Sequence, residues 1–251
     1  MFRPAVLIGL YNHGGTIAEV VRPLRAQGLP VLVVDDGSDA ATRAKLDELR
    51  QLFPDVRVEH LPVNGGKGAA MIRGFDLLER DGFTHALTLD ADGQHETACA
   101  PTFIAAARRE PTALVLGQPV FDSSAPKARL YGRLISRIWV HIETLSLAIA
   151  DPMCGYRCYP LRATNEVVRS YTPRTRMDFD PEIAVRLCWQ GTPIVNVPTR
   201  VIYPTTGISH FRLWSDNGRI TWMHTRLFFG MLARGPRLLW RRRASEGGAG
   251  T

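Results

Sequence analysis

Short apolar runs alternate with longer amphipathic stretches along the first half of the chain. The runs favour buried strands, and they cover Ala5–Leu10, Val31–Val34, Val56–Leu61, Ala86–Leu89 and Ala113–Gly117. Helical spacing between them predicts helices over Thr16–Gln27, Ala41–Leu52, Gly68–Asp81 and Pro101–Arg109. Strands that alternate with helices indicate an α/β fold with a mostly parallel, Rossmann-like sheet, flanking helices and right-handed crossovers.

The second half of the chain is less regular. We expect one amphipathic helix over Arg129–Ile149, followed by a loop over Asp151–Tyr159 that is dense in proline, glycine and cysteine. The remaining expected elements are a helix over Pro181–Gln190, short strands over Ile194–Val197 and Thr199–Tyr203, and an amphipathic helix over Trp214–Leu232.

Polar residues follow each of the first four predicted strands. The four clusters are Tyr11-Asn12, Asp35-Asp36-Gly37-Ser38, Asn64-Gly65-Gly66-Lys67-Gly68 and Asp90-Ala91-Asp92-Gly93-Gln94. The carboxyl ends of parallel strands meet at one edge of a sheet, and ligands bind beyond that edge. The sequence therefore predicts one binding site to which all four clusters contribute.

Asp90 and Asp92 follow the fourth strand at positions i and i+2, so both carboxylates can point to the same side. Such hard oxygen ligands suit Mg²⁺ or Mn²⁺, which usually keep waters and bridge to substrate phosphates. Gln94, one alternate position further, adds a neutral oxygen to this metal site. Because Asp-x-Asp is also common in turns, the motif gains its meaning from its place at the sheet edge.

Two interpretations of Asp35 and Asp36 stay open. In the first, the acidic turn caps the following helix, and Gly37 supplies an unusual backbone angle. In the second, a carboxylate accepts a hydrogen bond from a base or a ribose of a bound nucleotide.

Lys67 offers a point charge to phosphate in a glycine-rich loop that lets the backbone approach a ligand. The spacing of that loop is not that of a Walker motif.

Together with the segment from Asp151 to Arg157, these clusters resemble family 2 glycosyltransferases, in particular the branch that acts on dolichyl and other polyprenyl phosphates. The resemblance covers roughly residues 5 to 205 and rests on the order and spacing of five motifs. It implies a GT-A fold, an inverting mechanism, a UDP- or GDP-sugar donor and a divalent metal. Transferred by motif, Tyr11, Asn12 and Asp36 hold the base and ribose, while Asp90, Asp92 and Gln94 bind the metal diphosphate.

The resemblance assigns Asp151 to Arg157 to the acceptor side, and the acceptor decides which chemistry is needed there. A hydroxyl nucleophile needs a general base, for which Asp151, Asp180 and Glu182 are candidates and Asp151 is preferred. A lipid phosphate is already anionic and needs positioning and charge neutralisation instead. The guanidinium groups that suit this second task belong to Arg129, Arg133 and Arg157.

Composition supports an ordinary globular protein, with 45% hydrophobic and 22% charged residues. The four cysteines show neither zinc-site spacing nor a disulfide framework, so we expect reduced thiols. The sequence shows neither the features of a signal peptide nor an apolar stretch of about 18 residues, the length of a membrane span. These features indicate a cytoplasmic protein that is soluble or peripheral on the inner face of the cell membrane.

The net charge of +7 resides in the C-terminal segment. Nine arginines and a single aspartate lie between Arg200 and Arg243, a net charge of +8, so the remaining residues sum to −1. Aromatic and apolar residues lie among these arginines, which suits an interfacial helix on an anionic membrane. The alternative is a helix that packs on the domain's own core or on a second copy in a homo-oligomer. Nucleic-acid binding rests on charge alone and is not expected.

We therefore expect a GT-A domain over 1–205, a basic amphipathic helical tail over 206–243 and a disordered end over 244–251. The predicted activity is inverting, metal-dependent transfer of a sugar from a nucleotide diphosphate sugar to a lipid-linked, polyprenyl-phosphate-like or other membrane acceptor. Two alternatives remain at this stage, namely transfer to a soluble or protein hydroxyl and a catalytically silent nucleotide-sugar-binding protein.

Overall fold

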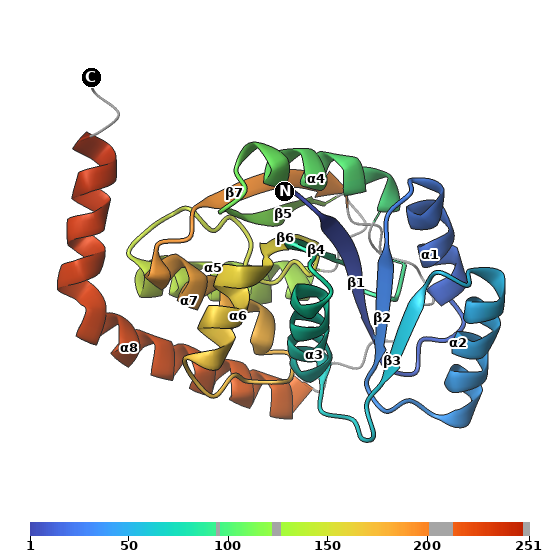
Figure 1. Ribbon diagram of the computed structural model, residues 1–251. Helices are drawn as coiled ribbons and strands as arrows, with labels where there is room; N and C mark the ends of the chain where they lie inside the picture. Colours follow the sequence, from blue (N-terminus) through green and yellow to red (C-terminus); the bar gives the residue numbers. More distant parts are fainter. Residues whose placement is uncertain (94–95, 122–126, 201–212, 248–251) are drawn as a thin grey trace.

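The computed structural model describes residues 1–93, 96–121, 127–200 and 213–247 (Figure 1). Its centre is a seven-stranded sheet with the order β3-β2-β1-β4-β6-β5-β7. The strands are β1 (Pro4–Leu10), β2 (Val31–Asp35), β3 (Arg57–His60), β4 (His85–Thr88), β5 (Leu114–Val120), β6 (Arg157–Pro160) and β7 (Ile194–Arg200). β6 runs antiparallel to both of its neighbours, β4 and β5, whereas the other recorded pairings are parallel.

Helices cover both faces of the sheet (Figure 1). They are α1 (Ile17–Ala26), α2 (Ala40–Leu52), α3 (Lys67–Arg80), α4 (Ala100–Arg109), α5 (Lys127–Thr144), α6 (Leu161–Arg169), α7 (Phe179–Gln190) and α8 (Leu213–Gly247), with a short 3₁₀ turn at Thr97–Cys99. The expected α/β fold with a mostly parallel sheet is confirmed, and so is a helical C-terminal segment.

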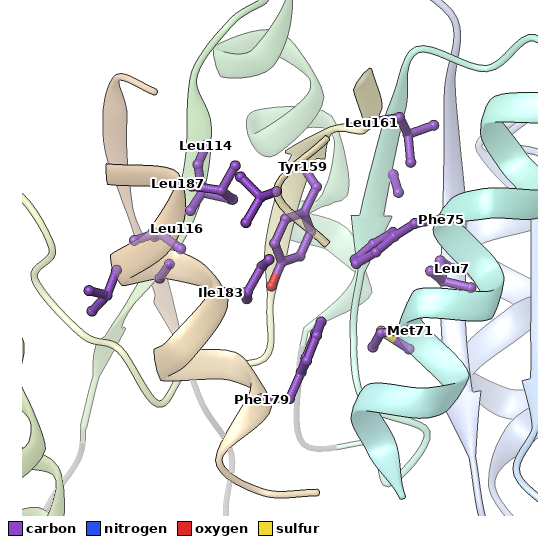
Figure 2. Packing of buried hydrophobic residues seen from close by; sticks show 14 of the residues in the cluster. Leu7, Met71, Phe75, Leu114, Leu116, Tyr159, Leu161, Phe179, Ile183 and Leu187 are labelled. Carbon is purple, nitrogen blue, oxygen red and sulfur yellow. The ribbon is translucent and has the colours of Figure 1, made fainter. Parts of the chain in front are cut away.

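Two hydrophobic cores lie on opposite faces of the sheet because alternate strand residues point to opposite sides. Val6 and Ile8 of β1 join the core under α1, α2 and α4, whereas Leu7 joins the core under α3, α6 and α7. Figure 2 shows this second core, where Phe75 of α3 lies beside Tyr159 of β6, with ring centroids 4.9 Å apart. The two cores hold the sheet rigidly behind the edge where β1, β2 and β4 end.

The expected loop over Asp151–Tyr159 is wrong at its end, because strand β6 begins at Arg157. All four residues of β6 are buried, so no alternation of polar and apolar positions marks the strand in the sequence. The helix α6 that follows was not predicted either. The two short strands expected around Pro198 form one strand, β7, as far as Arg200. β7 is an edge strand, where proline is tolerated because its missing N–H removes no inner ladder bond.

Helix α8 continues beyond Leu232, where the sequence predicted its end, and reaches Gly247 within the region expected to be disordered. Figure 1 shows it bent, and Pro236 lies inside it, which removes one helical hydrogen bond and crowds the preceding turn. The first residues of the expected tail, 206–212, lie outside the described part of the chain. Among the described residues, no helix is both long enough and apolar enough to traverse a bilayer.

Candidate functional site

Hydrogen bonds join the four polar clusters at one edge of the sheet. The backbone N–H of Asn12, beyond β1, donates to Ser38 Oγ at 3.0 Å, and Asp39 N–H donates to Asn12 Oδ1 at 3.0 Å. The loop after β3 is held by Asp36, which follows β2. Lys67, in the same glycine-rich cluster, contacts Asp90 beyond β4. The prediction that the clusters share one edge is confirmed by these contacts.

Lys67 lies at the centre of this edge. Its ammonium Nζ is 2.7 Å from Asp90 Oδ1 and 2.7 Å from Asp180 Oδ2, at the start of α7. Gly155 completes the cluster, because a Cβ atom on it would lie 2.5 Å from Asp90 Oδ2 and 2.8 Å from Lys67 Nζ. The backbone of the loop before β6 therefore packs directly against two charged side chains.

Electrostatics keep Lys67 protonated. Burial alone would lower the pKa of its ammonium, but the carboxylates of Asp180 and Asp90 raise it, and the net pKa lies above the usual range of lysine. The side chains of Lys67, Asp90 and Asp180 are 23%, 34% and 13% exposed. A permanent cation thus sits at a partly open edge, where the Asp90 carboxylate remains accessible.

The carboxylates at this edge fit a hard divalent cation that is completed by substrate oxygens. Asp90 is one-third exposed and Asp92 is half-buried, and both offer oxygen ligands. Within the described residues, no three histidine, cysteine, aspartate or glutamate side chains form a complete metal cage. In general, one or two protein carboxylates suffice for Mg²⁺ or Mn²⁺ when substrate phosphates supply further oxygens. Gln94, the third predicted ligand, lies outside the described residues.

Asp35, expected to bind substrate, has protein partners in the interior instead. Its side chain is fully buried; Oδ1 accepts from Ser38 N–H at 2.9 Å, and Oδ2 lies 2.8 Å from His60 Nδ1. Arg43 Nε is 3.6 Å from the same oxygen. The cap of α2 is Asp39, a few residues after the predicted acidic turn; its side chain accepts a hydrogen bond from Thr42 N–H at 2.8 Å. Asp35 thus braces the turn between β2 and α2.

Asp36 holds the loop that follows β3. Its two oxygens accept from Gly65 N–H at 2.8 Å and Gly66 N–H at 2.7 Å. Burial is the main cause that raises the pKa of this carboxyl group, against the two backbone donors and Arg176, which lower it. The carboxylate therefore fixes the position of the polar loop, and any contact that it makes to a nucleotide comes in addition to these bonds.

The glycine-rich loop contacts protein where the sequence predicted a ligand. A Cβ atom on Gly66, whose φ is 96°, would collide with the carbonyl oxygen of Thr175. Gly68 N–H donates to that same oxygen at 2.8 Å, and a Cβ atom on Gly68 would lie 2.8 Å from Phe179 Cβ. These two glycines therefore allow the segment before α7 to approach closely, and only Lys67 of this loop extends towards Asp90.

Two residues that the sequence assigned to the acceptor side, Asp151 and Arg133, form a close pair. Arg133 Nη1 donates to both oxygens of Asp151 at 2.9 Å, and Met153 N–H donates to Oδ1 at 2.7 Å. The guanidinium lies 5.4 Å from the centre of the Phe121 ring. Phe121 also lines a cavity of about 330 Å³ between the ends of β5 and β7, together with Val120, Pro198, Thr199 and Arg200. Two of the predicted acceptor residues are thus brought together beside an open space.

Arg157, expected to bind an acceptor phosphate, is completely buried and has a different task. Its guanidinium donates to the carbonyl oxygens of Pro152, Cys154 and Asp180, each at 2.6 Å, and to the Tyr159 hydroxyl at 3.2 Å. These bonds hold the loop before β6 over the edge and tie it to the start of α7. A phosphate outside the protein cannot reach this group, so the prediction is wrong in its mechanism.

Glu182, one of the three candidate bases, also points away from the edge. It is 1% exposed; Oε1 accepts from Arg186 Nη2 at 2.8 Å, and Oε2 accepts from Arg174 N–H at 3.1 Å. Helical geometry explains the difference from Asp180, because residues two positions apart point to different sides of a helix. The side chain of Arg129 lies outside the described part of the structure.

The segment before α7, which contains Thr175 and Arg176, contributes to the edge but was not predicted from the sequence. Arg176 Nη1 donates to Asn64 Oδ1 at 2.8 Å, and Thr175 accepts the bond from Gly68. No local signal marks these residues, since they contact a loop far away in the sequence. Gly155 is missed for a different reason, because a glycine inside a loop gives no hint of which side chain it allows to approach.

Comparison with known proteins adds an independent finding. The sequence profile described as "Glycosyl transferase family 2" matches residues 5–167. Polyprenol monophosphomannose synthase of Mycolicibacterium smegmatis is 28% identical over 82% of this chain and 80% of its own length. Undecaprenyl-phosphate mannosyltransferase of Micrococcus luteus is 28% identical over 82% of this chain and 86% of its own.

Solved structures share the fold at lower identity. Glucosyl-3-phosphoglycerate synthase from Mycobacterium tuberculosis, in complex with Mn²⁺, uridine diphosphate and glucosyl-3-phosphoglycerate, superposes with a TM-score of 0.67 at 14% identity. The match covers 92% of this chain and 80% of that one. TarS of S. aureus superposes with a TM-score of 0.55 at 15% identity, over 80% of this chain and 37% of its own. These structures have GT-A-like folds with a mostly parallel sheet.

Proposed function

The chain belongs to glycosyl transferase family 2, and we propose that within this family it transfers a hexose from a UDP- or GDP-sugar to the phosphate of a polyprenyl-phosphate-like lipid. The single observation behind this proposal is the pair of charged clusters at one edge, Lys67 with Asp90 and Asp180, and Arg133 with Asp151. The first cluster suits a diphosphate with a cation, and the second suits an anionic acceptor. The names of the two mannosyltransferase relatives support mannose and a polyprenyl phosphate.

The donor is held in this proposal by the ends of β1, β2 and β4. Tyr11, Asn12 and Asp36 contact the base and ribose, and Asp90, Asp92 and Gln94 bind the divalent cation. A divalent cation at Asp90 and Asp92 would offset the charge of the diphosphate and stabilise it as a leaving group. The complex of the fold relative with Mn²⁺ and uridine diphosphate supports this arrangement.

Lys67 gives the diphosphate a second positive charge. Its Nζ already lies 2.7 Å from Asp90, so an incoming phosphate and cation meet a preorganised set of one ammonium and two carboxylates. Preorganised charge is effective because no groups need to reorient when negative charge develops on the leaving oxygen. We expect Lys67 to turn from Asp90 towards the phosphate when the donor binds, while Asp180 keeps it in place.

A phosphate acceptor needs no general base. One of its oxygens attacks the anomeric carbon, the bond from that carbon to the diphosphate breaks, and the nucleoside diphosphate leaves from the opposite side, which inverts the anomeric centre. Arg133 supplies charge neutralisation, because its guanidinium can exchange the Asp151 carboxylate for the acceptor phosphate with similar geometry. Asp151 and Asp180 then act as positioning groups for Arg133 and Lys67.

The enzyme works in this proposal on the cytoplasmic side of the cell membrane as a peripheral protein. A lipid-linked acceptor keeps its phosphate at the membrane surface, where a peripheral protein can reach it. The relatives' names support the lipid acceptor, and the basic C-terminal segment, with nine arginines between Arg200 and Arg243, supports contact with anionic headgroups. A homo-oligomer remains an alternative use of the same segment.

The test is a transfer assay with the purified full chain. UDP- and GDP-linked glucose and mannose are combined with undecaprenyl phosphate in detergent, with 3-phosphoglycerate or without acceptor, in Mn²⁺ or Mg²⁺ and in EDTA. We expect formation of a sugar-linked lipid phosphate that depends on metal. Arg133→Gln should lower this rate by about 10–100-fold by removing a charge-assisted contact to phosphate. Arg137→Gln, one turn further along α5, is the matched control and should leave the rate in detergent unchanged.

Three results would contradict the proposal, the third of them only its metal dependence. Transfer to 3-phosphoglycerate with no transfer to the lipid would indicate a soluble acceptor. Donor binding without any turnover, for every donor and acceptor tested, would indicate a silent nucleotide-sugar-binding protein. Full transfer activity in EDTA would remove the metal from the mechanism and leave Lys67 as the main positive charge for the diphosphate.

A further inference from the structure

Helix α5 is inverted relative to an ordinary surface helix. Its exposed positions carry large apolar side chains, whereas its inward positions include the polar residues Ser136, Glu143 and Thr144. The exposed residues are spaced as one stripe along the helix, with exposures from 38% to 66%, and they are Tyr131, Leu134, Ile135, Ile138, Trp139 and Ile142. An apolar stripe of this length facing outward indicates an interaction surface.

The inward polar residues explain why α5 keeps this orientation. Glu143 Oε1 lies 2.8 Å from His224 Nδ1 of α8, and the backbone oxygen of Glu143 accepts from Trp189 Nε1 of α7 at 2.8 Å. Thr144 Oγ1 donates to the Val140 carbonyl oxygen at 2.7 Å. A rotation of the helix that hid the apolar stripe would break the buried contacts of Glu143 with Trp189 and His224, so the outward direction is built into the fold.

Helix α8 extends the apolar surface. Trp139 of α5 lies near His224 and Phe228 of α8, each with ring centroids 6.1 Å apart. Of the sixteen large hydrophobic side chains that are exposed in the described structure, twelve belong to α5, to α8 or to Leu147 just after α5. The share from α8 is Trp222, Phe229, Leu232, Leu239 and Trp240. By contrast, Met223, Leu227 and Met231, which the sequence assigned to the same interfacial helix, pack into the core.

The exposed charged side chains described on these two helices are all cationic. Over the described side chains 130–144 and 216–240, the only carboxylates are Glu143 and Asp216, which are 0% and 4% exposed. Exposed arginines line the same helices, namely Arg137, Arg219, Arg234 and Arg237. A broad apolar stripe with aromatic residues and a basic margin matches the interface of a bilayer with negatively charged headgroups.

We propose that this apolar surface of α5 and α8 lies on an anionic lipid bilayer, with the apolar stripe of α5 inserted at the level of the headgroups. This inference rests on the proposed function and deepens it, because Arg133 lies on the inner side of the same helix, where it contacts Asp151. Contact of α5 with the bilayer therefore sets the acceptor side next to the layer in which a lipid phosphate is presented. The main docking element is α5, and the C-terminal helix is its companion.

The test is co-sedimentation of the full chain with vesicles of phosphatidylcholine alone or mixed in equal parts with phosphatidylglycerol. We expect binding to the mixed vesicles that falls by about tenfold or more in Ile135→Asp/Ile138→Asp, because insertion of the stripe is replaced by charge. Leu52→Asp/Val63→Asp, at exposed apolar positions far from α5, is the matched control and should bind as the wild type does. Arg137→Glu should weaken binding to the anionic vesicles and leave the circular dichroism spectrum unchanged.

Unchanged vesicle binding in both α5 variants would overturn the inference. A wild-type dimer in sedimentation velocity that Ile135→Asp/Ile138→Asp converts into a monomer, with no vesicle binding in either form, would also overturn it in favour of a second copy. A short, water-soluble isoprenyl phosphate separates this inference from the proposed function. The α5 double variant should use it at the wild-type rate, whereas a chain that binds vesicles but transfers no sugar to any phosphate refutes the activity and leaves the docking surface standing.

Discussion

The ends of strands β2 and β4 both carry acidic residues, but their environments differ. Asp35 and Asp36 after β2 are 0% and 2% exposed, and they accept bonds from Ser38, Gly65 and Gly66 backbone groups. The side chain of Asp90 after β4 is 34% exposed, and the ammonium of Lys67 is one of its partners. The backbone N–H groups that bind Asp35 and Asp36 are fixed by the fold, whereas the side chain of Lys67 can rotate away from Asp90. The same residue type therefore braces the edge on one strand and can exchange partners on the other.

This difference teaches which carboxylates can serve a ligand. A buried carboxylate whose oxygens are used by the backbone contributes to stability, and its loss leaves unsatisfied donors. A carboxylate that is paired with a mobile cation and open to solvent can accept a metal or release the cation to a phosphate. Substitutions on the two strands should consequently separate stability from activity.

The largest expected effect is that of Asp90→Asn. Sugar transfer should fall by about 10²–10³-fold, because the proposed metal diphosphate site loses one of its charged ligands. The free energy of unfolding should change by less than about 1 kcal/mol, since the pair with Lys67 is partly exposed. Rates under saturating donor and urea unfolding measure the two quantities, and a large loss of stability with normal turnover would place Asp90 with the bracing residues.

Asp35→Ala should show the opposite pattern. Removing this buried carboxylate leaves Ser38 N–H and His60 without their acceptor and should lower the free energy of unfolding by about 2–3 kcal/mol. Below the unfolding transition, turnover should remain within a few-fold of the wild type. Asp47→Ala, an exposed aspartate on α2, is the control and should leave the urea midpoint unchanged. A drop in donor affinity without a loss of stability would restore Asp35 to the binding site.

The two carboxylate pairs also show how far the sequence leads. The place of Asp90 and Asp92 at a strand end can be predicted, because a short apolar run precedes them and this local pattern marks the end of a strand. The burial of Asp35 does not, because it depends on His60, which is 25 residues away. The role of Arg157 depends on its place in the antiparallel strand β6, and that of Glu182 on the inward face of α7. The local sequence around these two residues indicates neither the strand nor the face.

Lys67→Met sharpens the comparison further. Without the ammonium, Asp90 and Asp180 lose the positive charge that lies 2.7 Å from each of them, and a bound divalent cation can compensate part of this loss. The apparent affinity for donor should fall by about tenfold with loss of a phosphate contact, and Mn²⁺ should raise the melting temperature more than in the wild type. Thermal shifts with and without Mn²⁺ measure this, with Lys45→Met on α2 as the control. Equal shifts in all three proteins would show that Lys67 and the metal do not share a site.

The smallest effect is expected for Glu182→Gln. Helix α7 carries both kinds of carboxylate, one at the edge beside Lys67 and one in the interior. Asp180 faces Lys67, whereas Glu182 pairs with Arg186 in the interior. The turnover number should stay within about twofold of the wild type, while the free energy of unfolding falls by about 1 kcal/mol through a weaker hydrogen bond to a charged group. The pH dependence of the transfer rate completes the test. If the fall in rate at low pH disappears in this variant, Glu182 acts as the general base.

The bond between Asn64 and Arg176 affects how the chain matures during synthesis. These residues are 112 positions apart, and Asp180, which holds Lys67, follows a few residues later. While the ribosome is still making the second half, β1 to β4 can already pair, but the lysine lacks its second carboxylate and the glycine loop lacks the segment that covers it. Contacts of such long range form late in folding. A nascent or prematurely ended chain therefore has the parallel part of the sheet but an unfinished edge, in which Lys67 lacks Asp180 and Gly68 lacks the carbonyl oxygen of Thr175.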